Sequence, residues 1–380
     1  MSRRIGKAAA VTSAVAALIA IAGCSSSGSG SGGSNPAPAV STTAVAADIT
    51  AAKALLAEYS GKVSAFPVDA PLTKRLPSSA SLVYLQCASP VCAIAGNIVA
   101  AAAKTMGINY SKINAGPSVS TQQAAMDSIA TLKPTALMIA GLDPTGIGPQ
   151  LRKLVASGVT VGTVGLQKTA PYGVQAPFNT EAANTKEAAL LAAWAVLKNG
   201  QNTNSVIYET PELSFSPVVV SGYLAEMKAL CPSCKARKVD IPLASVGTDA
   251  SSRIVSDLQN HPDTKTAIFS DLDVETGLPA ALKTAGIKVQ TAGLSPSPSG
   301  LQDIKDGNLD AAVAVDLPVL FWTDVDMTAR VGTGQPATAG EKSGIPSGQL
   351  LEKADVAFDP SNGFSGYPDY VQRFEKYWKG

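Results

Sequence analysis

Four cysteines in two closely spaced pairs are the residues of this chain best suited to covalent chemistry. Cys87 and Cys92 form one pair, and Cys231 and Cys234 enclose the dipeptide Pro-Ser. A Cys-x-x-Cys motif that opens a helix directly after a strand is typical of a redox site, because the helix dipole lowers the thiol pKa. Here the second pair instead follows a helical run that ends at Leu230. Of the three pairings that four cysteines allow, sequence proximity therefore favours two structural disulfides, Cys87–Cys92 and Cys231–Cys234.

Other catalytic and metal-binding patterns are missing from the sequence. The single histidine, His261, precedes a proline where a helix should stop, so a helix-end role explains it. Without a second histidine we expect no zinc site. The stretch 141–148 contains glycines but lacks the lysine of a phosphate-binding loop and the spacing of a dinucleotide-binding loop. No nucleophile elbow or Ser-His-Asp set appears. We therefore expect no catalytic residues, no metal, no cofactor and no enzyme activity.

The charge composition argues against a nucleic-acid partner. The chain of 380 residues contains 30 Lys and Arg against 29 Asp and Glu, which gives a net charge of +1. No basic run follows the first seven residues. Because phosphate binding needs clustered cations, we expect no nucleic acid to bind.

The first 23 residues have the composition of a secretory signal. Three cations within residues 1–7 precede an uncharged, alanine-rich run from Ala8 to Ala22, which is shorter than the ~20 residues that a spanning helix needs. The run ends Ile-Ala-Gly-Cys at residues 21–24, and this ending resembles the lipobox of bacterial lipoproteins. We therefore predict a lipoprotein signal peptide over residues 1–23 and lipidation of Cys24. Acyl chains on Cys24 would anchor the protein to the outer side of the cell membrane.

A low-complexity tract follows the predicted lipidation site. Residues 25–34 contain only serine and glycine, and such a tract cannot bury apolar surface. We predict a Ser/Gly-rich tether over residues 24–47. An N-terminal helix and a lead-in segment are expected over residues 48–80.

From Ser81 onward, apolar strand-like segments alternate with longer helical segments. The first series has strands at 81–86, 108–113, 136–140 and 160–164 and helices at 92–106, 119–132 and 146–156. After a helix at 181–197, a second series has strands at 205–209, 238–241, 266–270, 288–292 and 311–315 and helices at 217–230, 249–260 and 277–285. Such alternation predicts parallel sheets covered by helices on both faces. The fold class is therefore α/β, with two lobes.

Four stretches of this part occur in an order and spacing that carry a family resemblance. They are 132–139 (LKPTALMI) with 154–161 (LVASGVTV), then 258–269 (LQNHPDTKTAIF), 304–313 (IKDGNLDAAV) and 367–378 (YPDYVQRFEKYW). Together they resemble the type I periplasmic binding proteins, in particular the ribose-binding-like branch of that family. The resemblance covers nearly all of residues 81–380.

This resemblance implies two Rossmann-like lobes joined by a three-segment hinge. The crossings are expected near 178–181, 315–317 and 345–351. The N-terminal lobe then comprises residues 81–180 and 316–348, and the C-terminal lobe comprises residues 181–315 and 349–380. A small-molecule ligand is expected in the cleft, at the carboxyl ends of the parallel strands. The resemblance further implies a hinge closure that a membrane permease of an ABC importer recognises. We expect a monomer.

The residues matched to the family's ligand-binding positions depart from those of its sugar-binding members. Sugar-binding members have Asp-Arg where this chain has Gly165-Leu166, and Asn-Asp where it has Leu272-Asp273. The aspartate of their Gly-Phe-Asp turn is matched by Ser295, and their Gln-Asp pair is matched by Val315-Asp316. Sugar polar groups left without partners cost ~1–3 kcal/mol each, whereas burying apolar surface contributes ~25 cal/mol per Å². We therefore predict a ligand that is less polar than a free sugar.

Further candidate ligand-binding residues follow strands of each lobe. They are Gln86, Ser89, Pro90 and Asp143 in the first lobe, and Phe215 and Ser216 in the second. A Cys87–Cys92 bond would either stiffen the binding loop, which lowers the ordering cost of ligand capture, or only stabilise a surface loop. Asp143 is equally suited to cap the helix that follows it, and hinge or helix-cap roles are alternatives for Asp273 and Asp316. Phe215 is suited to stack on a ring of the ligand.

The sequence as a whole predicts an extracytoplasmic solute-binding lipoprotein that captures a small molecule for an ABC importer. The ligand is expected to be sugar-like by family but less polar. A receptor that presents its ligand to a membrane sensor kinase is the alternative. A thiol–disulfide redox protein that uses Cys231 and Cys234 is the third interpretation.

Overall fold

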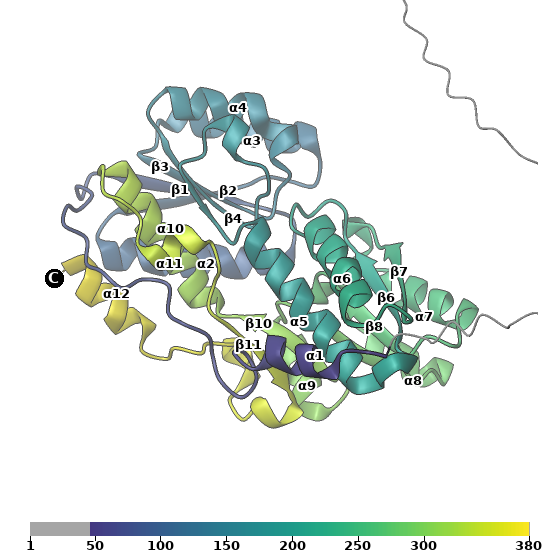
Figure 1. The fold of residues 1–380 in the computed structure, drawn as a ribbon. Helices are drawn as coiled ribbons and strands as arrows, with labels where there is room; N and C mark the ends of the chain where they lie inside the picture. Colours follow the sequence, from purple (N-terminus) through teal and green to yellow (C-terminus); the bar gives the residue numbers. More distant parts are fainter. Residues whose placement is uncertain (1–45, 380) are drawn as a thin grey trace, which may run out of the picture. The chain divides into compact units, whose positions relative to one another are not determined.

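Parallel strands joined by helices build two separate sheets in this protein (Figure 1). The computed structural model describes residues 46–379. The predicted signal peptide, the lipidation site Cys24 and the tether up to residue 45 lie outside the described residues. Two lobes with mostly parallel sheets confirm the predicted α/β fold class.

The first sheet has the strand order β2-β1-β3-β4-β5, and all of its pairs are parallel. Its strands are β1 (Ser81–Gln86), β2 (Asn109–Asn114), β3 (Ala136–Ala140), β4 (Thr160–Val164) and β5 (Ala176–Phe178). Helices α3 (Val119–Leu132) and α4 (Pro144–Ala156) pack together on one face, and α2 (Pro90–Met106) and α10 (Leu317–Gly332) cover the other (Figure 1). Every residue of β3 is buried, as expected for a strand covered on both faces.

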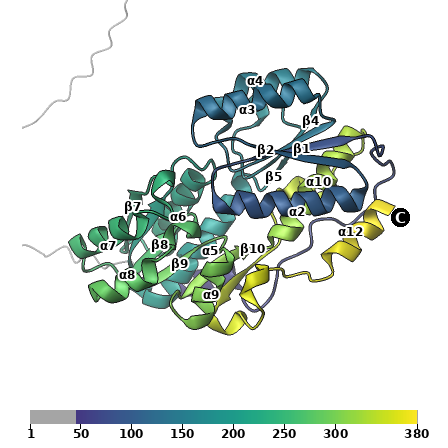
Figure 2. The same ribbon diagram turned by 180° about the vertical axis from the view of Figure 1, so that it is seen from behind.

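The second sheet has the order β11-β10-β9-β8-β6-β7, with only β11 antiparallel to its neighbour. Its strands are β6 (Asn204–Glu209), β7 (Lys235–Asp240), β8 (Thr266–Phe269), β9 (Gln290–Leu294), β10 (Ala311–Val315) and β11 (Gly348–Glu352). Helices α5 (Glu181–Asn199) and α6 (Ser216–Leu230) cover one face, and α7 (Ala250–Asn260), α8 (Leu278–Ala285) and α9 (Pro298–Asp306) cover the other (Figure 2). Val206 and Tyr208 belong to the core beneath α7–α9, whereas Ile207 belongs to the other core, because successive strand residues point to opposite faces.

Both sheets repeat one strand order. The order β2-β1-β3-β4-β5 of the first sheet corresponds to β7-β6-β8-β9-β10 of the second. In each sheet the order reverses beside the first strand of the series, between β1 and β3 or between β6 and β8. Loops diverge at such a switch point and leave a crevice at the carboxyl ends of the strands.

The chain passes between the lobes at the three predicted crossings. They lie between β5 and α5, between β10 and α10, and between α11 (Ala339–Ser343) and β11. Two further segments of the described chain also connect the lobes. Residues 57–80 lead from α1 (Ile49–Leu56), which packs on α5, to β1, and residues 353–369 lead from β11 to α12 (Tyr370–Lys379).

The closing helix α12 packs against the first lobe, which differs from the predicted lobe boundaries. The sequence analysis placed residues 349–380 in the C-terminal lobe, but α12 contacts α2 and α10. Trp378 stacks on Trp322 of α10 with 5.1 Å between ring centroids, and its indole N–H donates to Asp326 at 2.6 Å. The apolar face of α12 therefore packs on α10 of the first lobe. Of residues 349–380, only those in β11 belong to the second sheet.

Both predicted disulfides are present, Cys87–Cys92 and Cys231–Cys234. Cys231 is buried and ends α6, and β7 begins directly after Cys234. The pair therefore lies at the C-terminus of a helix, where the helix dipole does not favour a thiolate. This position fits a structural link between α6 and β7.

Truncation of Trp378 tests how strongly α12 holds to the first lobe. We expect Trp378→Ala to lower the free energy of unfolding by about 3–5 kcal/mol, because a buried indole and its ring contacts are lost. Urea unfolding followed by circular dichroism measures this change. Lys376→Ala, at an exposed position on the same helix, should change the free energy by less than about 0.5 kcal/mol. Equal effects of the two substitutions would contradict the packing described here.

Candidate ligand-binding cleft

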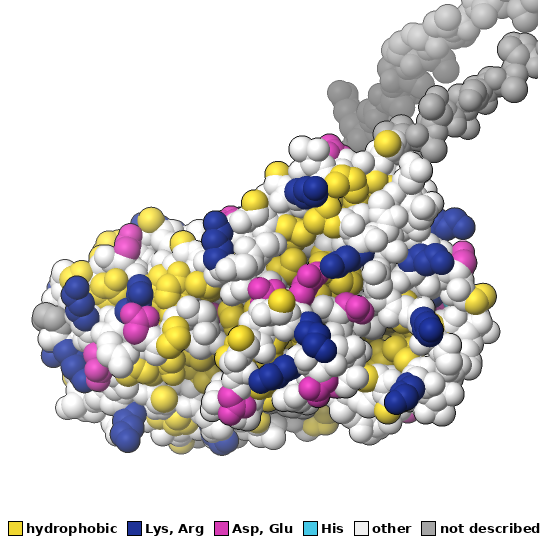
Figure 3. Space-filling view, turned by 90° about the horizontal axis from the view of Figure 1, so that it is seen from below, with side chains coloured by type: hydrophobic (Ala, Val, Ile, Leu, Met, Phe, Trp, Pro, Cys, Tyr) yellow, Lys and Arg dark blue, Asp and Glu magenta, His cyan; other side chains and the backbone are white. Residues whose placement is uncertain are grey.

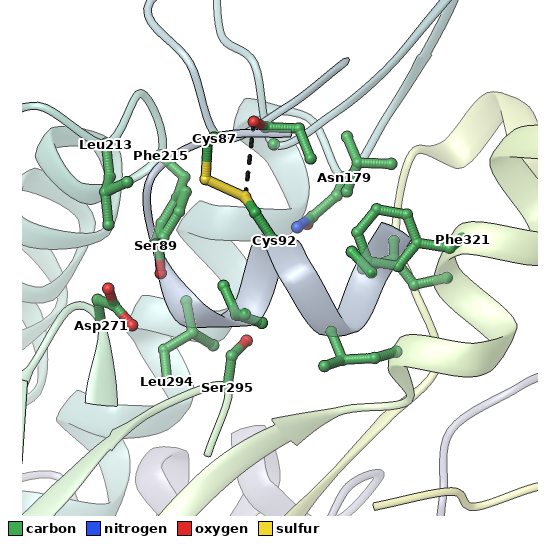
Figure 4. A pocket seen from close by; sticks show the side chains of 18 of the residues that line it. Cys87, Ser89, Cys92, Asn179, Leu213, Phe215, Asp271, Leu294, Ser295 and Phe321 are labelled. Atoms are coloured by element: carbon green, nitrogen blue, oxygen red, sulfur yellow. Dashed lines mark hydrogen bonds between the residues drawn. A yellow bond between two sulfur atoms is a disulfide. The ribbon is translucent and has the colours of Figure 1, made fainter. Parts of the chain in front are cut away.

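A small cavity lies where the carboxyl ends of the two sheets meet (Figure 4). Its wall combines residues that follow β1, β3, β4 and β5 with residues that follow β6, β8, β9 and β10. The cavity volume is about 70 Å³. Each lobe contributes one side, so the site is formed only when the lobes are together.

The wall of the cavity is mainly apolar. Its larger apolar side chains are Val91, Leu213, Phe215, Leu294, Leu320 and Phe321. The Cys87–Cys92 disulfide also lines it. The polar side chains that reach the wall are Ser89, Asn179, Asn184, Asp271 and Ser295. Such a mixture, with few polar groups on an apolar surface, is typical of small-molecule sites.

Hydrogen bonds join the two lobes around the cavity. The Ser89 hydroxyl donates to Asp273 at 3.3 Å. The backbone N–H of Ser214 donates to the Gly141 carbonyl at 3.3 Å, and the N–H of Gln167 donates to the Ser214 hydroxyl at 2.9 Å. With the lobes in contact, the cavity is smaller than the ~150 Å³ that accommodates a benzene ring. A ring-sized ligand therefore needs the lobes to separate.

Asp273 of the second lobe lies at the N-terminus of α2 in the first lobe. Ser89 is the N-cap residue of α2, yet its side chain makes no capping hydrogen bond within the helix, because its hydroxyl is turned toward Asp273. Burial raises the pKa of Asp273, while the Ser89 hydroxyl, the Val91 amide and the Ser297 hydroxyl act to lower it. A carboxylate at this end of a helix meets the positive end of the dipole, so Asp273 caps a helix of the opposite lobe.

Asp271 is a buried carboxyl group on the cavity wall with one oxygen unpaired. Its Oδ1 accepts from the Asp273 N–H at 3.3 Å, and its Oδ2 is buried without a hydrogen-bond partner in the described part of the chain. Burial and, to a smaller extent, the Asp273 carboxylate raise the pKa of Asp271 to about 8. No Lys, Arg or His is among the residues that line the cavity.

An amide network lies beside the first crossing. Asn184 of α5 accepts from the Gln167 side chain at 2.7 Å and donates to Glu187 at 2.9 Å. Burial raises the pKa of Glu187 to about 7, against the opposing effect of the Asn184 amide. Asn179 and Ser295 both line the cavity with positive φ angles of 51° and 56°. Non-glycine residues in this region are uncommon and cluster at functional sites.

Three residues selected from the sequence, Ser89, Phe215 and Ser295, line the cavity. Leu166 and Leu272 are buried, but their neighbours Gly165 and Asp271 form the wall in their place. Two more of the selected residues, Asp273 and Ser216, lie close behind this wall. Ser216 is directly behind Phe215, with its hydroxyl 2.6 Å from that of Ser270.

The remaining selected residues lie outside the cavity wall. Asp143 is exposed and caps α4 by accepting from the Thr145 N–H at 2.9 Å. Asp316 caps α10 by accepting from the Val319 N–H at 3.2 Å and also from the Gly366 N–H at 2.8 Å. Gln86 ends β1 with a buried Oε1 that has no partner among the described residues, and Pro90 begins α2.

Several wall residues were not selected from the sequence. They are Val91, Asn179, Asn184, Leu213, Asp271, Leu320 and Phe321. Asn179 lies within the predicted crossing at 178–181, and Asp271 directly follows the predicted strand at 266–270, so position in the chain offered a signal for both. Leu320 and Phe321 lie shortly after the predicted crossing at 315–317, but α10, the helix that carries them, was not predicted.

Within residues 46–379, no group of three or more His, Cys, Asp or Glu is arranged to hold a metal ion. No helix of the same region is long and apolar enough to cross a bilayer.

Comparison with known proteins identifies a matching family and several solved structures with a similar fold. The sequence matches the family model described as "Periplasmic binding protein domain" over residues 83–336. No curated protein matches the sequence. The fold is similar to that of the 5-methylthioribose transporter solute binding protein from Thermotoga lettingae TMO, with a TM-score of 0.66 and 14% identity, covering 81% of this chain and 99% of that one.

Two more solved structures are similar over most of the chain. GanP, a glucose-galactose binding protein from Geobacillus stearothermophilus, has a TM-score of 0.64 and 14% identity, with 74% of this chain and 99% of that chain covered. The XylFII-LytSN complex has a TM-score of 0.64 and 13% identity, with 73% of this chain and 100% of that chain covered. The matched parts are two-lobe α/β folds, and the family model begins at residue 83, after the 46–80 segment.

Removal of Asp273 tests its role between the lobes. We expect Asp273→Ala to shift the protein toward an open state by roughly tenfold, because buried donors left unpaired in the closed state cost ~1–3 kcal/mol each. Single-molecule energy transfer between dyes at Lys104→Cys of α2 and Lys283→Cys of α8, both exposed, reports the lobe separation. Asp306→Ala, at an exposed position of the second lobe, serves as control. An unchanged distance distribution in Asp273→Ala would argue against an inter-lobe cap.

Proposed function

The chain belongs to the periplasmic binding protein domain family of ABC transporter solute-binding proteins, and we propose that it captures a small molecule between its lobes for an ABC importer. The observation that carries this proposal is the cavity at the carboxyl ends of both sheets, with walls from both lobes. A ligand held there contacts both lobes at once and therefore favours the closed state over the open one. Closure is the change that a partner permease recognises.

The ligand is proposed to be less polar than a free sugar. Aromatic and aliphatic side chains dominate the wall, and no guanidinium is present among its residues to form bidentate hydrogen bonds with hydroxyl groups. Hydroxyl groups placed against Phe215, Leu294 and Phe321 would lose their water partners without replacement. An apolar group in the same place contributes favourably by leaving water.

A macromolecular polyanion is a poor fit to the surface. Figure 3 shows one face of the molecule on which Lys and Arg side chains are interspersed with Asp and Glu and with hydrophobic side chains. Mixed charge of this kind does not concentrate positive potential as phosphate binding requires. This pattern supports a small molecule as the ligand.

We further propose that the protein is anchored outside the cell membrane through a lipid on Cys24. The ending Ile-Ala-Gly-Cys at residues 21–24 and the Ser/Gly tract behind it support this proposal. The two disulfides fit an oxidising compartment. A lipid anchor would keep the folded part near its permease.

The alternative function is presentation of the ligand to a membrane sensor kinase. It uses the same cavity and the same closure, and one of the similar structures is a complex of XylFII with LytSN. Affinity purification of the full-length protein from its own membranes distinguishes the two functions. A co-purifying permease supports import, and a co-purifying sensor kinase supports signalling.

The proposed ligand class is tested by native mass spectrometry and titration. Protein purified gently from its own host should carry a molecule that is more hydrophobic than a pentose or hexose. Phe215→Ala should weaken its binding about tenfold or more, because ring contact and burial are lost. Phe358→Ala, at a partly buried position that packs against the second core and does not line the cavity, is the control for general damage. Micromolar binding of a free pentose or hexose would contradict the proposed class.

The anchor is tested by replacing Cys24. Cys24→Ala should release the protein from the membrane fraction into the soluble extracytoplasmic fraction, because no acyl chain can be attached. Cell fractionation followed by immunoblotting measures the distribution. Ser25→Ala, directly beside it, should leave the protein in the membrane fraction. Membrane retention of the Cys24→Ala protein would refute lipid anchoring at this residue.

A further inference from the structure

We propose that the ligand carries a protonated amine that pairs with Asp271, and an apolar body that faces Phe215 and Phe321. This inference rests on the proposed function, because it takes the cavity between the lobes as the ligand site. It adds the charge of the ligand and the orientation in which it is bound.

The carboxyl group of Asp271 points to a missing positive partner. Asp271 is 4% exposed and lines the cavity. Its Oδ2 has no hydrogen-bond partner among the described residues. Buried polar groups in native proteins are paired in the large majority of cases, and a buried charge without a partner is costly. Since Asp271 belongs to the cavity wall, a ligand in the cavity is the candidate for the missing partner.

The surroundings of Asp271 strengthen the case for a cation. Asp271, Asp273 and Glu275 follow β8 within one short turn, and all three are buried. Glu275 also has an unpaired oxygen, Oε2, and it faces Asp303 of α9 in addition to Asp273. Among the described residues none of the three forms an ion pair, and none of the wall residues is cationic. Once they are ionised, carboxyl groups with low-dielectric walls and no protein cation create a negative potential that favours a positive ligand.

A metal ion does not explain these carboxyl groups as well as an amine does. The described residues contain no group of three or more possible ligands arranged around a metal position. Asp273 is already engaged by Ser89 across the lobes. One free carboxylate oxygen suits a single N–H donor of an ammonium group.

The other end of the cavity is apolar. Figure 4 shows Asp271 close to Ser89 and Leu294, with Phe321 toward the opposite end of the pocket and Phe215 above. Phe321 is buried and Phe215 is half-buried. A ligand with an ammonium group at one end and a ring or branched chain at the other satisfies both ends. A hexose with hydroxyl groups on every side does not.

Matched pairs of small molecules separate the charge of the ligand from its polarity. We use 2-phenylethylamine against 2-phenylethanol, and glucosamine against glucose, with the detergent-solubilised full-length protein. Thermal shift and isothermal titration calorimetry at pH 8 report binding. We expect 2-phenylethylamine to bind at least tenfold more tightly than 2-phenylethanol, because only the amine brings a positive charge to Asp271.

Substitution of Asp271 should remove this preference. Asp271→Asn keeps the side-chain shape but loses the charge, and we expect amine and alcohol to bind it equally. Asp306→Asn, on the exposed surface of the same lobe, should retain the preference. If the Asp271→Asn protein does not fold, the pH dependence of the wild-type protein tests the same point.

The pH dependence has a defined sign. The pKa of Asp271 is raised to about 8, first by burial and then by Asp273, so the carboxyl group is mostly protonated at pH 6. Amine binding requires the carboxylate, and affinity should therefore rise by up to tenfold per pH unit between pH 6 and pH 8. It should fall again above about pH 10, where the amine loses its proton. The affinity for 2-phenylethanol should not rise over this range.

The outcomes separate this inference from the proposed function. Preference for amine over alcohol in the phenyl pair supports the inference. Equal binding of the pair, tighter binding of the alcohol or no binding of either amine at millimolar concentration overturns it. Tighter binding of glucose than of 2-phenylethanol would instead contradict the less polar ligand class, whatever the amines do.

Discussion

Parallel pairing of the strands is the constraint on which the cleft depends. Neighbouring parallel strands need a crossover connection, here a helix, so the loops after all strands of a series leave the sheet at one edge. Both sheets repeat the same strand order, and their carboxyl edges face each other across the cavity. Eight separate strand ends thus supply the wall of one small site. No pair of neighbouring residues in the sequence could supply such a wall.

The two lobes are connected more extensively than a three-segment hinge requires. Residues 57–80 run from the second lobe to the first, and hydrogen bonds hold this segment to both lobes. The N–H of Leu350 donates to the Tyr59 carbonyl at 2.9 Å, and Arg330 of α10 donates to the carbonyl of Pro71 at 3.3 Å. Trp378 returns the C-terminus to α10. Lobe motion in this protein therefore has to be accommodated by five segments of the described chain, of which the N-terminal one precedes the part matched by the family model.

The cleft carries features that do not stabilise the fold. Asp271 holds a buried oxygen without a partner, and Asn179 and Ser295 hold positive φ angles. The carboxyl group of Asp273 is buried at the N-terminus of α2 in the other lobe. Burial of carboxyl groups and left-handed backbone each cost free energy. All of these features lie on or directly beside the cavity wall, where the two lobes meet.

The sequence by itself determined most strands, most helices, the disulfide pairs and the family. Strands β1, β3, β4 and β10 and helix α3 have the predicted bounds, because local periodicity and buried apolar runs encode them directly. Close spacing along the chain was enough to favour Cys87–Cys92 and Cys231–Cys234. Strands β5 and β11 and helices α9, α10 and α11 were not predicted. Of these, β5 and α11 have only three and five residues, which are too few to establish a period.

Only the tertiary structure decided which loop residues line the cavity. Gly165 and Asp271 line the cavity where Leu166 and Leu272 were expected, a displacement of one residue in each loop. A strand alternates with a fixed period, but a loop has none, and the positive φ angles of Gly165 and Ser295 redirect the chain just where the wall forms. The side chains of Asp143 and Asp316 accept hydrogen bonds from backbone amides at helix N-termini, which have no partner within the helix. The contact of Asp273 with α2 exists only because two distant segments meet across the hinge, which no local pattern specifies.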